Sequence, residues 1–483
     1  MTQTLEQLRS QSASFGNEPL LTLPNGEVLN LANGYIPLLT NFTHEDKAAK
    51  GLRKRKAGQQ PETPIYFSAL ELVSDNAILF LTGASGSGKT TFAKHLSFAL
   101  ATTGLDKPSP LIRNELGDIH DEIWGGGKLL PSYFATSGLE SLRTLTEHTL
   151  PRLLDHMNHD GDGVLIILDD IEAAGNEDSQ RAALLIADLV PAASEAEERI
   201  AKLVLKVVEE GLLSPGDRER AGRVLSRLGD PRDLTALAEI PAGNFIMGSD
   251  NHPNSQPTNS IALGRFRIGI YPVVNKDYLA FTRQTGRDWF SVDGADPERL
   301  NAPATDLTWH DARAYCSWLT VRWRKKGKIS STEHVRLPTE PEWERASRGD
   351  QDGADGDGQV YPWGSNWRGD ATNSEETGFN NTCAVGLFPK GRSPYGCYDM
   401  AGQVWEWCTT LWGKDMANPQ FRYPWKHDDR EIIGAAGEIR RVLRGGCFSS
   451  PQVKANCTYR GSLEPAGFWR GNGFRVVVAA EPS

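Results

Sequence analysis

Eight residues near the start of the chain combine glycines with a lysine and a threonine at a spacing that suits phosphate binding. The run Gly83-Ala-Ser-Gly-Ser-Gly-Lys-Thr90 follows the apolar stretch Ala77–Leu81 and precedes an amphipathic run. Glycines let successive backbone N–H groups face a phosphate, and a following helix presents its positive N-terminus to it. Lys89 would reach the β- and γ-phosphates of ATP, and Thr90 would offer its hydroxyl to Mg²⁺. The predicted nucleotide contacts in this loop are Gly83, Gly86, Gly88, Lys89, Thr90 and Thr91.

A second apolar run supplies the acidic partner that such a loop needs. Val164–Leu168 is typical of a buried strand, and Asp169 and Asp170 follow it directly. We expect Asp169 to hold the Mg²⁺ through water. Asp170 is the candidate catalytic residue, because it could orient or deprotonate an attacking water. A solvated Asp-Asp turn after a buried strand is the alternative interpretation.

The last part of the chain has the composition of a binding surface. Phe448–Asn472 mixes aromatic side chains with Ser, Thr, Asn, Arg and Gly, between an RVLRGG lead-in and a GFRVV exit. Rigid aromatics supply contact area and small polar residues adapt, as in antibody loops. Ordinary core and surface aromatics are the alternative. The candidate ligand-binding residues are Phe448, Ser449, Thr458, Tyr459, Ser462, Leu463, Phe468, Trp469, Arg470 and Asn472.

The elements that must position these residues fall into several domains. A chain of 483 residues is too long for one ordinary core, and all six cysteines and twelve of the thirteen tryptophans lie beyond residue 239. Two capped amphipathic helices are predicted between the halves, one after Ser194 and one from Ser214-Pro215. We therefore predict an N-terminal segment (1–60), an α/β nucleotide-binding domain (61–190), a helical linker (191–235) and a C-terminal domain (236–483).

Composition also excludes several classes of protein. The formal charge of −10 argues against a nucleic-acid partner, because phosphate neutralisation needs a clustered basic face. No run approaches the roughly 18 apolar residues of a membrane span, and the first residues lack the apolar run of a signal peptide. The sequence thus predicts a cytoplasmic protein with reduced cysteines and no membrane contact.

Five motif-like runs follow one another in the C-terminal half. They are EIPAGNFIMGS (Glu239–Ser249), APATDLTWHDARAYCSWL (Ala302–Leu319), VRLPTEPEWERA (Val335–Ala346), YGCYDMAGQVWEW (Tyr395–Trp407) and the segment from RVLRGG to GFRVV (Arg441–Val477). Together they resemble the sulfatase-modifying, formylglycine-generating enzyme family. The resemblance implies an irregular α+β domain of the C-type-lectin-like kind. It also implies a calcium site, whose ligands carry over as Asp399, Gly402, Val404 and Glu406.

The same resemblance argues against the chemistry of the active enzymes. They bind copper through two cysteines five residues apart in the last segment, and copper(I) needs soft ligands. Here Ser450 and Ala455 lie near those positions, while Cys447 and Cys457 are ten residues apart. A binding domain built on the enzyme's fold is therefore the preferred interpretation, and a formylglycine-generating oxidase tethered to an NTPase is the alternative.

The N-terminal motifs resemble signal-transducing P-loop NTPases of the NACHT and STAND kind. Domains of the C-terminal fold also include variable proteins of diversity-generating retroelements, whose diversified residues lie in the last segment. Both resemblances favour a multidomain, ATP-binding, receptor-like protein that uses Mg²⁺ and Ca²⁺. Its lectin-like domain is expected to bind a ligand, most simply another protein.

Overall fold

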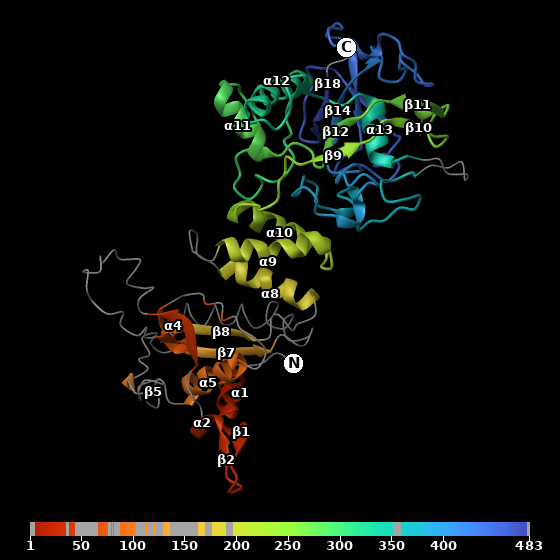
Figure 1. The fold of residues 1–483 in the computed structure, drawn as a ribbon. Helices are drawn as coiled ribbons and strands as arrows, with labels where there is room; N and C mark the ends of the chain where they lie inside the picture. The colour runs from red at the N-terminus through yellow and green to blue at the C-terminus, as the bar shows by residue number, and fades with distance from the viewer. Residues whose placement is uncertain are drawn as a thin grey trace, which may run out of the picture. The chain divides into compact units, whose positions relative to one another are not determined.

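The computed structural model divides the chain into two compact units, Met1–Ala196 and Glu197–Ser483 (Figure 1). It describes residues 5–34, 38–43, 66–75, 79, 81, 87–102, 112–113, 119–120, 129–135, 163–169, 176–189, 197–350 and 359–480. Among these residues, no helix combines the length and the apolar character needed to cross a bilayer.

The N-terminal unit combines helices with short paired strands. Its helices are α1 (Leu5–Ser14), η1 (Phe15–Asn17), α2 (Leu31–Gly34), α4 (Ala69–Asp75), α5 (Lys89–Thr102) and α8 (Asn176–Leu189). Its strands are β1 (Pro19–Thr22), β2 (Val28–Asn30), β3 (Leu39–Thr43), β4 (Tyr66–Ser68), β5 (Ile112–Arg113), β6 (Ile119–His120), β7 (Leu129–Ala135) and β8 (Gly163–Asp169).

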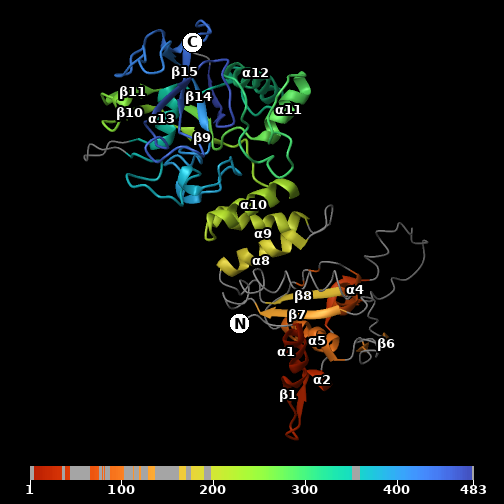
Figure 2. The same cartoon turned by 180° about the vertical axis from the view of Figure 1, so that it is seen from behind.

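The pair β7–β8 and helix α5 form the centre of this unit. The two strands are parallel and in register from Leu129 opposite Gly163 to Ala135 opposite Asp169. Helices α5 and α1 pack against the pair, as Figures 1 and 2 show. Helix α5 buries Phe92, Leu96 and Leu100, which share one face because they are four residues apart. The predicted strand Val164–Leu168 is confirmed as part of β8.

The second unit begins with a hairpin of two helices, α9 (Glu197–Glu210) and α10 (Pro215–Leu228). The predicted start of α10 is confirmed, because the Ser214 hydroxyl accepts the backbone N–H of Asp217 and Pro215 opens the first turn. Ile200, Val204 and Val207 are fully buried, as the apolar stripe of the sequence predicts.

The helical hairpin packs tightly on the domain that follows it. The Ser226 hydroxyl donates to the carbonyl of Pro297 at 2.7 Å, and Arg218 donates to the carbonyl of Leu387 at 2.8 Å. A Cβ at Gly222 would lie 2.6 Å from the Cβ of Ala384, so only glycine allows this approach. The residues predicted as a linker therefore include helices that belong to the same compact unit as the C-terminal domain.

The C-terminal domain contains two four-stranded sheets, a separate hairpin and three longer helices. The sheet orders are β13-β18-β12-β9 and β16-β15-β14-β17, and β10 pairs with β11. The strands are β9 (Leu237–Ile240), β10 (Gly243–Met247), β11 (Asn259–Leu263), β12 (Phe266–Gly269), β13 (Glu333–Arg336), β14 (Trp405–Gly413), β15 (Arg440–Arg444), β16 (Arg460–Leu463), β17 (Asn472–Gly473) and β18 (Val477–Ala480). The helices are η3 (Pro253–Ser255), α11 (Asn275–Thr285), α12 (Trp309–Lys325), α13 (Glu340–Arg348), η4 (Glu375–Thr377), η5 (Pro389–Gly391) and η6 (Asp429–Glu431).

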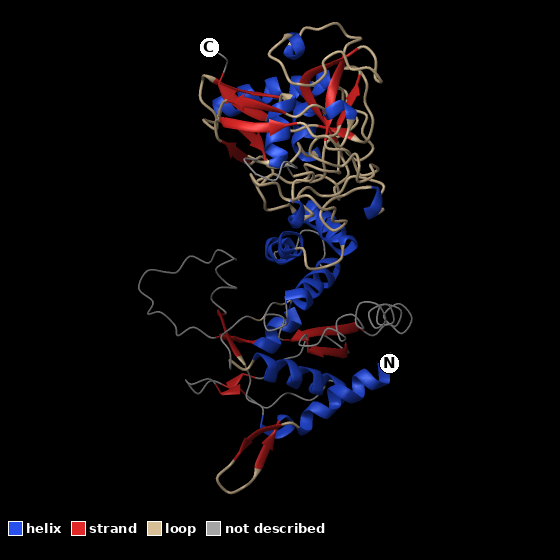
Figure 3. Cartoon of the chain, turned by 90° about the vertical axis from the view of Figure 1, so that its right-hand side faces the viewer, coloured by secondary structure: helices blue, strands red, loops and turns tan. Residues whose placement is uncertain are grey.

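Two apolar cores cover opposite faces of these strands. Neighbouring residues of a strand point to opposite faces, so Val478 joins the cluster of α11 and α12 while Val477 joins the cluster of α13. Figures 1 and 2 show α12 and α13 on opposite sides of β14. Long loops connect the elements, as Figure 3 shows, which confirms the expected irregular α+β domain. Trp309 and Tyr315 lie in the first core, as their helical spacing predicts.

Candidate functional site

The glycine loop leads into helix α5 at Lys89. Gly88 has a φ of 86°, a left-handed conformation that suits glycine, and α5 follows it directly with Lys89, Thr90 and Thr91 in its first turn. The first N–H groups of a helix have no acceptor within the helix, so this turn can donate hydrogen bonds to phosphate oxygens. Gly83 and Gly86 lie outside the described residues.

Asp169 ends strand β8 next to the first turn of α5. The Thr90 hydroxyl donates to Asp169 Oδ1 at 3.2 Å, although the two residues are 79 positions apart. The two predicted halves of the nucleotide site therefore meet. A hydroxyl beside a carboxylate fits Mg²⁺, which prefers oxygen ligands; bound there, the metal would neutralise phosphate charge. Asp170, the candidate catalytic residue, lies outside the described residues.

The predicted calcium ligands form one tight, buried turn between Asp399 and strand β14. Asp399 and Gly402 both have positive φ values, 59° and 73°, so the chain turns sharply here. Gly402 and Val404 are buried, and their carbonyl oxygens accept no hydrogen bond from any described residue. Buried carbonyls normally have a donor or another electrophilic partner. These two oxygens and the Asp399 carboxylate fit a hard cation such as Ca²⁺.

The carboxylates of this turn differ in their surroundings. Glu406 is fully buried, and its two oxygens accept hydrogen bonds from Arg475 at 2.6 and 2.7 Å. The indole N–H of Trp343 adds a third, at 2.7 Å. Asp399 accepts one hydrogen bond, from the backbone N–H of Gly386 at 2.7 Å, and burial raises the pKa of its carboxyl to about 6. A cation would therefore compensate Asp399 more than Glu406, whose charge Arg475 already balances.

We expect calcium to stabilise the C-terminal domain through Asp399. A ligand at a hundred times its Kd stabilises the native state by about 2.7 kcal/mol, so chelation should lower the melting temperature. Asp399→Ala should abolish this response, whereas the matched change Asp288→Ala, on an exposed loop, should retain it. Differential scanning calorimetry with calcium or with a chelator measures the effect. An equal response in Asp399→Ala would show that the turn holds no calcium.

The residues predicted to bind the ligand surround the end of the second sheet; we call Phe448–Asn472 the binding segment. Phe468 is 58% exposed and Trp469 is 40% exposed. Ser449 and Arg470 are also exposed, and Tyr459, Ser462 and Leu463 are half-buried. Phe448, Thr458 and Asn472 are buried, so they lie beneath the surface of the segment.

The exposed side chains form two neighbouring groups. Trp469 lies against the buried Phe448 ring, with ring centroids 6.5 Å apart, and the Arg470 guanidinium covers the same ring at 5.6 Å. Tyr459 instead lies between His252, at 4.8 Å, and Trp405, at 6.0 Å. Trp405 connects the groups, because its backbone N–H donates to the carbonyl of Gly471.

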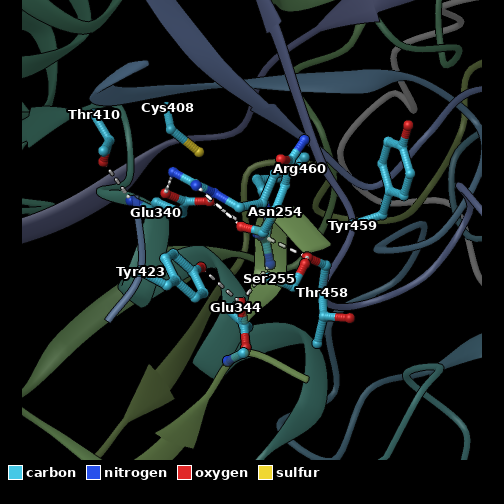
Figure 4. A network of polar contacts seen from close by, with 12 residues as sticks. Asn254, Ser255, Glu340, Glu344, Cys408, Thr410, Tyr423, Thr458, Tyr459 and Arg460 are labelled. Carbon is cyan, nitrogen blue, oxygen red and sulfur yellow. Dashed lines mark hydrogen bonds and ion pairs between the residues drawn. The ribbon is translucent and has the colours of Figure 1, made fainter. Parts of the chain in front are cut away.

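A buried charge network, made of Glu340, Glu344, Arg444 and Arg460, contacts the binding segment. Figure 4 shows Glu340, Glu344 and Arg460 of this network. Glu340 pairs with Arg460 through two hydrogen bonds, at 2.6 and 2.8 Å, and with Arg444 at 2.9 Å. Glu344 pairs with Arg444 at 2.6 Å. All four side chains are inaccessible to solvent. Burial alone would raise the pKa of Glu340, but the charges of Arg460 and Arg444 outweigh it and hold this pKa below its usual value.

The network contacts the middle of the segment. Arg444 ends β15, four residues before the segment, and donates to the backbone carbonyls of Cys457 and Thr458. Arg460 begins β16 and stacks on Tyr423 at 4.5 Å. These arginines and the glutamates of α13 are not among the residues predicted from sequence, although all of them fall within the motif-like runs of the C-terminal half.

The cysteines of the chain do not form a reactive pair. All six are buried and free, and burial raises the pKa of Cys457 to about 12, which disfavours a thiolate ligand. The Ser347 hydroxyl donates to Cys457 Sγ at 3.0 Å, and Cys447 Sγ lies 3.3 Å from the Ser449 hydroxyl. Within the described ranges, no three His, Cys, Asp or Glu side chains gather as a metal site with three side-chain ligands of these types would require.

Comparisons with known proteins agree with these motifs. Residues 228–480 match the model of the sulfatase-modifying factor enzyme 1-like domain, and residues 61–127 match that of Novel STAND NTPase 3. The inactive C-alpha-formylglycine-generating enzyme 2 of Mus musculus is 29% identical over 53% of this chain and 89% of its own length. The formylglycine-generating enzyme of Bos taurus is 28% identical over 53% of this chain and 78% of its own. Treponema denticola variable protein 1 aligns with 51% of this chain and 95% of its own, with 21% identity and a TM-score of 0.38. The first model covers more than half of the residues of this chain. The chain therefore belongs to the family of the sulfatase-modifying factor enzyme 1-like domain, with a STAND NTPase region ahead of that domain.

Proposed function

We propose that this protein is a receptor-like, nucleotide-binding protein whose C-terminal domain binds a protein ligand through the binding segment. One observation carries the proposal: Phe468, Trp469 and Arg470 are exposed in consecutive positions, and the buried Phe448 ring lies beneath Trp469 and Arg470. Exposed aromatic residues beside an arginine are the side chains that dominate protein-binding hot spots. A rigid base lowers the entropy lost when such side chains become ordered in a complex.

The buried members of the segment have a supporting role in this proposal. Phe448 is 5% exposed and carries both Trp469 and Arg470 on its ring. Thr458 accepts at its backbone carbonyl from the Ser255 hydroxyl at 2.6 Å, and Asn472 pairs with Trp405 across β17 and β14. These residues would orient the exposed side chains, and the exposed ones would contact the ligand.

Replacing both Trp469 and Arg470 by alanine should weaken ligand binding by at least about 2 kcal/mol, or roughly thirtyfold in Kd. Partners retained by the wild-type protein would be purified, and their affinity for each variant would be measured by calorimetry. Met416→Ala is the matched control, because Met416 is 64% exposed on another loop. Equal affinities for the wild type and the double variant would overturn the proposed ligand surface.

The competing function is oxidation of a cysteine to formylglycine, which the named activity of the bovine relative favours. Ser450 and Ala455, near the family's reactive positions, have no thiol, and Cys457 instead accepts a hydrogen bond from Ser347. We expect a CxPxR peptide to keep its thiol after incubation with the protein, copper and oxygen, as mass spectrometry would show. Peptide oxidation that disappears in Cys447→Ser or Cys457→Ser would establish the enzyme instead.

For the N-terminal unit we propose binding of ATP with Mg²⁺. The contact between Thr90 and Asp169 supports this assignment, because it joins the helix after the glycine loop to the acid that ends β8. Nucleotide binding and ligand binding in one chain are the two activities that a signal-transducing receptor requires.

A further inference from the structure

Tyr133, on strand β7, contacts the proposed magnesium carboxylate from the side opposite Thr90. Its hydroxyl donates to Asp169 Oδ2 at 2.7 Å, while the Thr90 hydroxyl donates to Oδ1 at 3.2 Å. Tyr133 is two residues before Ala135, the partner of Asp169 in the parallel register, so the tyrosine reaches diagonally across the strand pair. Each carboxylate oxygen thus has its own hydroxyl donor.

This arrangement has a consequence for the orientation of the carboxylate. The terminal torsion of an aspartate is broad, so a carboxylate with one donor can rotate, whereas two donors on different oxygens fix its plane. A hydroxyl group has one proton to donate and two lone pairs. Thr90 can therefore donate to Oδ1 and still offer a lone pair to a cation, provided that Oδ1 keeps its place.

Phe15 of the N-terminal segment packs against the Tyr133 ring. Phe15 meets the Tyr133 ring edge-on, with centroids 4.9 Å apart, and both rings are buried in the same cluster. Glu18 binds Lys94 of α5 at 2.8 Å, and the Lys94 ammonium lies 5.5 Å from the Phe15 ring. Helix α1, immediately before Phe15, packs against both α5 and β7 (Figures 1 and 2).

We propose that Tyr133 is a positioning residue for the Mg²⁺ half of the nucleotide site, and that Phe15 of the N-terminal segment holds it there. The proposal rests on the proposed nucleotide binding by this unit. Tyr133 keeps the Asp169 carboxylate in the plane that serves Thr90 and the cation. Because its hydroxyl acts on the carboxylate, its effect is expected in the metal-dependent part of the affinity.

The test compares nucleotide affinity with and without the metal. The full-length protein is titrated with a fluorescent ADP analogue, first in excess Mg²⁺ and then in a chelator. For Tyr133→Phe we expect the gain in affinity from Mg²⁺ to fall about tenfold, in keeping with loss of a hydrogen bond to a charged group, while the affinity in chelator is unchanged. Ser97→Ala is the matched control, because the buried Ser97 hydroxyl donates only to the Ala93 carbonyl of its own helix, at 2.9 Å.

A second variant keeps the test decisive if Tyr133→Phe folds poorly. Phe15→Leu retains the Tyr133 hydroxyl but removes the aromatic ring that packs against the Tyr133 ring. It should reduce the gain in nucleotide affinity from Mg²⁺ by a smaller factor than Tyr133→Phe does. The positioning role is overturned if Mg²⁺ raises the nucleotide affinity of Tyr133→Phe as much as that of the wild type. If only Phe15→Leu folds, the same result for that variant overturns it. Equal losses with metal and with chelator also overturn it, because they indicate a purely structural role. Absence of any binding by the wild type overturns the proposed nucleotide site itself.

Discussion

Replacing Glu340 by glutamine should lower the free energy of unfolding of the C-terminal domain by about 3–5 kcal/mol, because it removes one partner from a buried ion-pair network. Glu340 accepts three hydrogen bonds from Arg444 and Arg460, and all three side chains are inaccessible to water. The neutral amide leaves two buried guanidinium groups with only Glu344 as an acidic partner. Urea unfolding followed by tryptophan fluorescence measures the loss.

The matched control is Glu239→Gln in the same domain. Glu239 pairs with Arg265 at 2.8 Å, but these side chains are 55% and 73% exposed. Such a pair contributes about 0–1 kcal/mol, so its loss should hardly change the unfolding midpoint. Because the pKa of Glu340 is lowered in the folded state, its stabilisation is present above its unfolded pKa and is lost as the pH falls through its folded value. Similar midpoints for Glu340→Gln and Glu239→Gln would contradict a stabilising network.

Lys89→Ala should weaken binding of ATP with Mg²⁺ by at least about thirtyfold, or roughly 2 kcal/mol, because a buried phosphate would lose its cationic partner. We expect the fold to be retained, because Lys89 donates to the Ser87 hydroxyl at an exposed position, at 3.3 Å. Calorimetric titration with a slowly hydrolysed ATP analogue measures the change. Lys202→Ala is the control, because Lys202 is an exposed helix residue that pairs with Glu198.

A nucleotide-dependent rise in melting temperature gives an independent measurement, since a ligand that binds only the native state must stabilise it. The wild type and Lys202→Ala should show the rise, and Lys89→Ala should not. If Lys89→Ala binds as tightly as the wild type, the glycine loop is a turn before a helix and not a phosphate site.

Local signals predict where individual helices begin. Thr308 and Thr339 each form a capping box, at the starts of α12 and α13. The Ser214-Pro215 pair likewise begins α10. Such signals act within one turn of helix, so they are visible in a short window of sequence.

The charged core of the candidate site could not be predicted in this way. Every residue of α13 is buried, including Glu340, Glu342 and Glu344, whereas a run of charges normally predicts a solvated face. The arginines that compensate Glu340 are 104 and 120 residues away, so no local pattern connects them. The contact of Tyr133 with Asp169 also joins residues 36 positions apart and has no motif. Conversely, the predicted linker helices proved to be part of the C-terminal unit, because glycine at 222 permits a close approach that composition does not reveal.

The division of the binding segment into an inward frame and an outward surface affects how freely the protein can evolve. Arg444 and Arg460 face inward, whereas Ser449, Lys454 and Trp469 face outward. Substitutions at exposed positions usually change stability by no more than about 0.5 kcal/mol, whereas breaking a buried ion pair costs several times that. Under the proposed function, recognition and folding are encoded by different residues of one short stretch. Such a surface could then be re-targeted by mutation of its outer positions alone, while the domain retains its stability.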